Sequence, residues 1–106
     1  MTFEELLQMM RSTGLPFAAA GWAKAPKGDY GTVAYRAFDP QFADNKVVYI
    51  EREATIVLQS RTDGEKSAKL IEDKLHTMDD HITWWLESVD YDETTGLNVW
   101  IWGLLL

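Results

Sequence analysis

Apolar residues recur at every second position between residues 46 and 60, and this pattern constrains the fold more than any other feature of the chain. The apolar members of one face are Val48, Ile50, Ala54, Ile56 and Leu58. A period of two predicts a long β-strand with one face toward a core and the other toward water. Arg52 interrupts the apolar face, which indicates a snorkelling side chain or a nearby β-bulge. Such a strand needs a second layer against its apolar face.

An amphipathic helix over residues 3–13 can supply part of that layer. Its apolar residues follow helical spacing and are Phe3, Leu6, Leu7 and Met10. Thr2 and Glu5 have the spacing of a capping box, in which the side chain of each residue accepts a hydrogen bond from the backbone N–H of the other. Gly14 and Pro16 then predict the end of the helix.

A second amphipathic helix is expected over residues 65–78. Its apolar stripe consists of Ala68, Ile71, Leu75 and Met78. Thr62 and Glu65 repeat the capping-box spacing at its start. We expect both helices to pack on the strand face that carries Val48, Ile50, Ile56 and Leu58.

The remaining segments read as short strands and loops. Strands are expected at residues 15–22, 30–37, 81–89 and 97–105, and loops at residues 39–45 and 90–96. The element order is then α-β-β-β-α-β-β. Mostly sequential hairpins with two helices predict an α+β two-layer sandwich, with an antiparallel or mixed sheet and both helices on one face.

The composition fits one folded domain over residues 1–106 and excludes several functions. The chain contains no cysteine, so thiolate metal sites and cysteine nucleophiles are excluded, and an intracellular location is expected. We expect neither a signal peptide nor a membrane span, because charges interrupt every apolar run. The net charge of −7 argues against sequence-specific nucleic-acid binding.

The residues that could carry chemistry do not form a known constellation. His76 and His81 flank Asp79 and Asp80, but this spacing matches no zinc motif and is typical of a solvated helix end. The acidic cluster near Asp90 lacks the spacing of a calcium loop and is expected to be a solvated turn. We therefore expect no catalytic residues, no metal site and no cofactor, and a protein that is not an enzyme.

Aromatic residues near the C-terminus are the strongest candidates for function. The neighbours Trp84 and Trp85 must point to opposite faces of a regular strand, and we expect Trp85 to point outward. Trp100 and Trp102 should share one face. Together with the loop before the long strand, the candidate protein-interface residues are Trp85, Trp100, Trp102, Phe38, Phe42, Asp44 and Asn45.

Three segments give the chain a family resemblance. They are MTFEELL at residues 1–7, TGLPF at residues 13–17, and FADNKV at residues 42–47 followed by Tyr49. In this order they resemble short prophage-encoded proteins of Firmicutes from the head–tail joining and tail morphogenesis region. The tryptophan-rich hairpin and the apolar ending depart from that family's pattern.

The resemblance implies a structural virion assembly protein, namely a tail-completion, tail-terminator-like or neck subunit. Such a subunit would form a homo-oligomeric ring, a hexamer by family analogy, with tail tube and head connector proteins as partners. It would assemble in the cytoplasm of the bacterial host and remain in the virion neck or tail. The alternative from the residues alone is a monomeric or dimeric adaptor or inhibitor that binds one protein.

Overall fold

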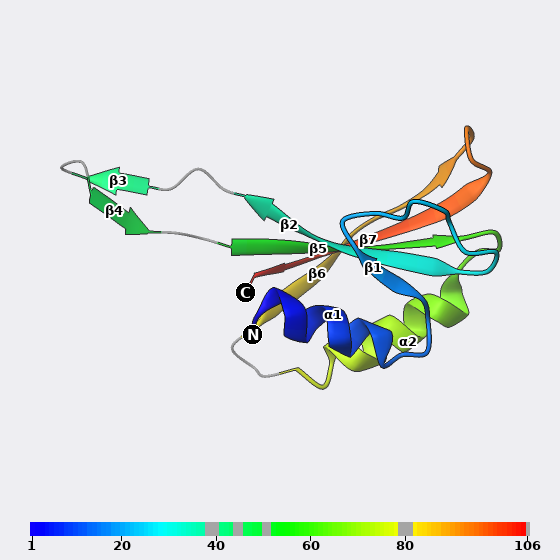
Figure 1. Ribbon diagram of the computed structural model, residues 1–106, viewed down its shortest axis with the longest axis horizontal. Helices are drawn as coiled ribbons and strands as arrows, with labels where there is room; N and C mark the ends of the chain where they lie inside the picture. The colour runs from blue at the N-terminus through cyan, green and yellow to red at the C-terminus, as the bar shows by residue number, and fades with distance from the viewer. Residues whose placement is uncertain (38–40, 44–45, 50–51, 79–81, 106) are drawn as a thin grey trace.

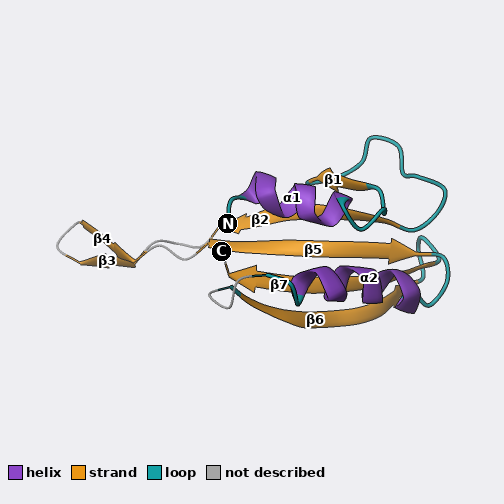
Figure 2. Ribbon diagram, turned by 90° about the horizontal axis from the view of Figure 1, so that it is seen from below, coloured by secondary structure: helices purple, strands orange, loops and turns teal. Residues whose placement is uncertain are grey.

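The computed structural model describes residues 1–37, 41–43, 46–49, 52–78 and 82–105. It consists of a mixed five-stranded sheet with two helices on one face, and a separate two-stranded ladder (Figures 1 and 2). The elements are α1 (Phe3–Arg11), β1 (Phe17–Ala19), β2 (Tyr30–Ala37), β3 (Gln41–Ala43), β4 (Lys46–Tyr49), β5 (Arg52–Ser60), α2 (Glu65–Leu75), β6 (Thr83–Asp92) and β7 (Leu97–Leu105). The predicted α+β class and the two-layer arrangement are confirmed, and the order α-β-β-β-α-β-β holds for the helices and the strands of the five-stranded sheet.

The strand order of the larger sheet is β1-β2-β5-β7-β6. The pair β1–β2 is parallel, and the other three pairs are antiparallel. The central strand β5 therefore joins the N-terminal half of the sheet to the C-terminal hairpin. Within the part of the chain that the structure describes, no helix is long and apolar enough to cross a lipid bilayer.

Both predicted helices bury three of the four residues in the expected stripe, and both end earlier than expected. Phe3 is only partly buried, and Met78 lies beyond the end of α2. The capping box of α1 forms, because Glu5 N donates to Thr2 Oγ1 and the Glu5 carboxylate accepts from Thr2 N. At its end, the Ser12 hydroxyl donates to the Met9 carbonyl, and the Thr13 hydroxyl does the same to Met10. Such local hydrogen bonds compete with helix continuation.

The prediction of a capping box at the start of α2 is wrong. Gly64 takes the N-cap position with a φ of 78°, where it makes no side-chain cap. The Thr62 hydroxyl lies instead within hydrogen-bond distance of Ser60 Oγ, at 3.1 Å. Asp63 Oδ1 accepts from Glu65 N at 3.0 Å. A hydroxyl cluster at the end of β5 therefore holds Thr62 away from the helix.

The expected single strand over residues 46–60 and the expected loop over residues 39–45 also need correction. The strand is divided between β4, which pairs with β3, and β5, which pairs with β2 and β7. Part of the expected loop is the strand Gln41–Ala43. The other expected loop is shorter than residues 90–96, because β6 continues to Asp92 and pairs there with Leu97.

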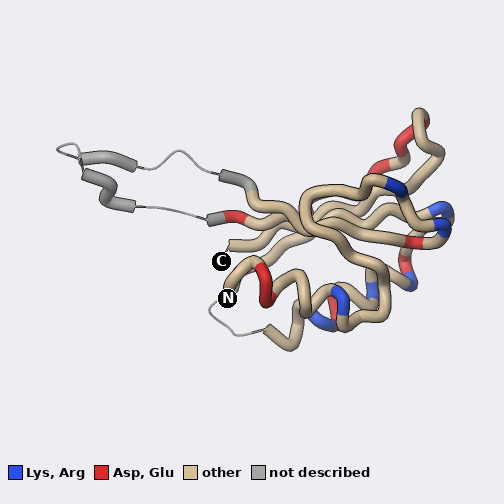
Figure 3. Tube along the Cα trace, viewed as in Figure 1, with Lys and Arg blue, Asp and Glu red and all other residues tan. Residues whose placement is uncertain are grey.

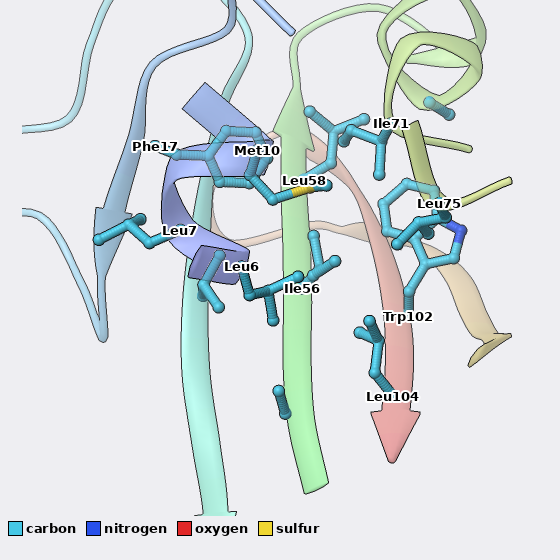
Figure 4. Packing of buried hydrophobic residues seen from close by; sticks show 13 residues of the cluster. Leu6, Leu7, Met10, Phe17, Ile56, Leu58, Ile71, Leu75, Trp102 and Leu104 are labelled. Atoms are coloured by element: carbon cyan, nitrogen blue, oxygen red, sulfur yellow. The ribbon is translucent and has the colours of Figure 1, made fainter. Parts of the chain in front are cut away.

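The hydrophobic core lies between the helices and the sheet (Figure 4). Leu6 and Met10 of α1 and Ile71 of α2 are fully buried, as are Ile56 and Leu58 of β5. The predicted packing of the two stripes on β5 is thus confirmed for Ile56 and Leu58. The other two predicted contacts lie outside what the structure describes, since Ile50 and the side chain of Val48 fall there.

Candidate functional site

On the side of the sheet opposite the helices, the described residues form no second layer, and only the loop between β1 and β2 crosses part of it (Figure 1). On β7, alternate side chains divide between the two faces. Trp102 and Leu104 are fully buried on the helix side, so Ile101, Gly103 and Leu105 point the other way. Residues directly opposite each other in an antiparallel ladder share a face, which extends the assignment to β5, β6 and β2.

We name this surface the open face. Its described residues include Thr32, Ala34, Glu53, Thr55, Val57, Gln59, Trp85, Asp90, Val99, Ile101, Gly103 and Leu105. Glu53 and Asp90 carry charges at opposite ends of this face. Between them, Thr55, Val57, Trp85 and Ile101 are uncharged and half-buried in the isolated chain. Charged positions lie mainly at the ends of the sheet and on the helices (Figure 3). The centre of the open face is therefore uncharged and largely apolar, with a carboxylate at each end.

Trp85 occupies a defined position on the open face. It lies directly opposite Gly103 in the β6–β7 ladder. A Cβ atom built on Gly103 would come within 2.4 Å of the Trp85 ring, so the ring lies flat against this glycine. The neighbour Trp84 packs on the helix side, with its ring 5.1 Å from that of His76. The predicted division of this pair between the two faces is confirmed.

Trp102 does not belong to an interface. Its side chain is fully buried, and its Nε1 donates to Glu72 Oε2 of α2 at 3.2 Å. Trp100 lies on the same helix side, as predicted, and stacks on Trp102 with a ring separation of 5.9 Å. Its Nε1 donates to the Asp63 carbonyl at 2.8 Å, which anchors the loop before α2. Both residues therefore connect the sheet to α2, because their rings share its helix-covered face.

The structure describes only part of the remaining interface candidates. Phe38, Asp44 and Asn45 lie outside the described residues. Phe42 lies in β3, where its backbone pairs with Val47 of β4. The ladder β3–β4 lies beyond the end of the five-stranded sheet (Figures 1 and 2).

One corner of the uncovered side is protected by the loop between β1 and β2. Trp22 Nε1 donates to the Gly31 carbonyl at 2.9 Å. Its ring meets that of Tyr30 edge to face at 6.4 Å, and Tyr30 is only 8% exposed. This contact covers the start of β2, whereas the surface around Val57 and Ile101 stays open. The sequence signal for Trp22 was its place in an apolar run, which gave no indication of this role.

A cluster of hydroxyl and carboxylate groups joins β2, β5 and α2. Ser60 Oγ donates to Asp29 Oδ1 at 2.8 Å, and Ser67 Oγ donates to Asp29 Oδ2 at 2.6 Å. Ser60 is fully buried and Ser67 nearly so, which keeps a substrate away from either hydroxyl. We therefore interpret the cluster as a structural link between the sheet and α2.

The histidine-rich segment gains no support as a metal site. His76 packs against Trp84, and Asp79, Asp80 and His81 lie outside the described residues. Among the residues that the structure does describe, no three histidine, cysteine, aspartate or glutamate side chains come together around a metal-sized space. The open face thus remains the surface of the described chain that stands out chemically.

Compared with models of known protein families and with curated proteins, the sequence gives no significant match to either.

Proposed function

We propose that the protein is a non-enzymatic assembly subunit that forms a homo-oligomeric ring through its open face. The observation that carries the proposal is the uncharged centre of the sheet surface, around Trp85, Val57 and Ile101, over which the described residues place no second layer. Monomeric proteins rarely leave contiguous apolar patches of more than a few hundred Å² in water. A second protein surface is the natural cover for such a patch.

The size of the open face fits a stable contact. Four long strands spaced by about 4.8 Å, each about 30 Å long, present a flat area of roughly 600 Å² before side-chain relief is added. A standard protein interface buries about 800 Å² on each partner. Trp85 adds the kind of aromatic anchor that carries much of the binding energy in interfaces.

A more specific proposal, with its own support, concerns the place of the ring in a phage particle. It rests on the resemblance of residues 1–7, 13–17 and 42–49 to head–tail joining and tail-completion proteins of Firmicutes prophages. On that basis the ring would be a hexamer between the tail tube and the head connector, assembled in the host cytoplasm. Binding assays between the preformed ring and purified candidate partner proteins test this phage-specific proposal separately.

Light scattering coupled to size-exclusion chromatography tests the assembly proposal. We expect the wild-type mass to rise with concentration to a closed oligomer, and Trp85→Ala to shift the transition to higher concentration by roughly thirtyfold, equal to about 2 kcal/mol. Leu70→Ala is the matched control, because Leu70 is an exposed apolar residue of α2, away from the sheet. A wild-type chain that stays monomeric at every concentration would contradict the proposal.

The alternative, a monomeric adaptor, is favoured by a different surface. The edge strand β6 exposes Leu86, Val89 and Tyr91, of which Tyr91 is 61% exposed. A free edge of this length can accept a strand from a partner protein. A monomeric wild type, together with partner binding that is lost in Val89→Lys and kept in Trp85→Ala, would favour the adaptor over the ring.

A further inference from the structure

The five-stranded sheet ends in two edge strands of very different length. β1 has three residues, whereas β6 has ten. An edge strand presents backbone N–H and C=O groups that can pair with another chain, and proteins commonly shorten such an edge or block it. A comparison of the two edges therefore shows where this chain leaves room for a further strand.

The β1 edge is blocked by the chain itself. The Pro16 carbonyl accepts from Gly31 N of β2 at 2.9 Å. Because backbone groups alternate in direction along a strand, the next carbonyl, that of Phe17, points away from β2. Arg11 Nε of α1 donates to it at 3.1 Å. Ala20 then takes a φ of 63°, in the left-handed region, which ends the extended backbone. This edge is therefore closed to a further strand.

The β6 edge is long, and none of the described strands lies beside it. On its other side, β6 pairs with β7 from Thr83 to Asp92. A register shift between Leu86 and Ser88 interrupts this ladder, and such a bulge hinders pairing across it. Beyond the shift, Ser88–Asp92 pairs regularly over five residues, which is a common length for a strand. This segment, which we name the edge stretch, can pair with one short added strand.

Alternate side chains of the edge stretch form two rows. Val89 lies opposite Trp100 and Tyr91 lies opposite Asn98, so both point to the helix side of the sheet. They are 46% and 61% exposed, because α2 runs over β7 and β6 lies beyond it (Figure 2). Asp90, which is also exposed, belongs to the other row. A strand added here would meet apolar side chains on one face and a carboxylate on the other.

The charged residues of the β6–β7 hairpin are all acidic. Residues 83–105 contain no lysine or arginine, and their acidic residues are Glu87, Asp90, Asp92 and Glu93. A second copy of β6 would bring its own carboxylates beside these, and like charges on paired strands are destabilising. Lysine or arginine at alternate positions of an added strand would instead be attracted. Charge therefore favours a basic segment of another protein over a second copy of this chain.

We propose that the edge stretch binds an extended segment of another protein, in which apolar and basic residues alternate, as a sixth strand of the sheet. Backbone groups of the edge stretch form the main-chain hydrogen bonds, and its two side-chain rows select the segment. The apolar residues of the segment contact Val89 and Tyr91, and its lysine or arginine side chains pair with Asp90. The edge is the one that the adaptor alternative uses. The ligand is the same whether or not the chain forms a ring, because a strand added at the edge lies beside the open face and not over it.

Calorimetric titration with a synthetic peptide tests the selection by side chains. The probe is the end-capped peptide Thr-Lys-Val-Arg-Ile-Lys-Thr, added at protein concentrations where light scattering shows a monomer. We expect one peptide to bind per chain, and Asp90→Lys to weaken binding by about tenfold or more, because repulsion replaces attraction. Glu93→Lys is the matched control, since it changes the net charge equally in the turn beyond β6, and it should weaken binding less than about threefold. Equal losses in the two variants, or no binding at about 1 mM peptide, would overturn the proposal.

N-methylation of the probe tests the backbone pairing. Neighbouring N–H groups of a strand point to opposite sides, so methyl groups on alternate residues face either β6 or solvent. Of two peptides methylated in alternate sets, one should lose binding by about tenfold or more and the other should keep it. Equal losses with both peptides would overturn strand addition. So would a wild-type homodimer that Val89→Lys dissociates, because the occupant would then be a second copy. Neither result concerns the ring, which is tested by the mass of Trp85→Ala.

Discussion

The two faces of β7 bear equally apolar side chains in very different surroundings. On the helix side, Trp102 is fully buried and its Nε1 donates to Glu72. On the open side, Ile101 is half-buried beside Val57 of the neighbouring strand, and both helices lie on the other side of the sheet. One strand thus contributes to a completed core and to a surface that lacks its second layer. The difference separates residues that stabilise the fold from residues available for assembly.

The largest expected effect comes from deleting a side chain on the covered face. Trp102→Ala should lower the free energy of unfolding by about 3–5 kcal/mol, because it leaves a large cavity and an unpaired Glu72. Ile101→Ala, one residue away on the open face, should cost about 1 kcal/mol in the monomer, since its side chain is only partly buried there. Urea denaturation of both variants at monomeric concentrations measures the contrast. Equal losses would remove the distinction between the two faces.

A smaller effect is expected at Gly64, on the helix side. This residue has a φ of 78°, and an added Cβ atom would lie 2.8 Å from Trp100 Nε1. Gly64→Ala should cost at least about 1–2 kcal/mol, because an L-residue is disfavoured in the left-handed region and Trp100 is held by its hydrogen bond to Asp63. Gly28→Ala is the control, since nothing lies within 4 Å of its added Cβ atom. A neutral Gly64→Ala in thermal denaturation would contradict this view of the loop.

The smallest effect on stability, with a large effect on assembly, is expected at Gly103. An added Cβ atom would meet the Trp85 ring at 2.4 Å. The ring lies on an uncovered face and can swing toward solvent, so Gly103→Ala should cost only about 1 kcal/mol, at the low end for an overpacked site. The displaced ring should disturb the assembly contact. A loss of ring mass at nearly unchanged melting temperature, measured by light scattering and calorimetry, is the expected result.

Much of the fold follows from the sequence because local patterns and burial agree. The helical stripes of α1 and α2 and the strand over β7 lie where their periodicity indicates. The prediction of a capping box at Thr62 is wrong because the Thr62 hydroxyl lies beside Ser60 Oγ, which itself donates to Asp29, a long-range contact that spacing cannot reveal. The short strand β3 was missed because Pro40 and the polar residues around it are typical of a loop.

The candidate site was only partly predictable. Strand alternation assigned Trp84 and Trp85 to opposite faces correctly. It could not assign Trp102 to the core, because β7 is apolar on both faces and such a run reads as a strand buried on both sides. Which face the helices cover is decided by the chain path, and periodicity within one strand carries no information about it.

The central claim is that assembly buries the open face, and hydroxyl-radical footprinting across the concentration range of assembly tests it most directly. The labelling rate of Trp85 should fall as the mass rises. That of Trp22, which is 36% exposed at the protected corner, serves as the internal reference and should change little. A ring that forms while Trp85 is labelled as fast as in the monomer would contradict the account.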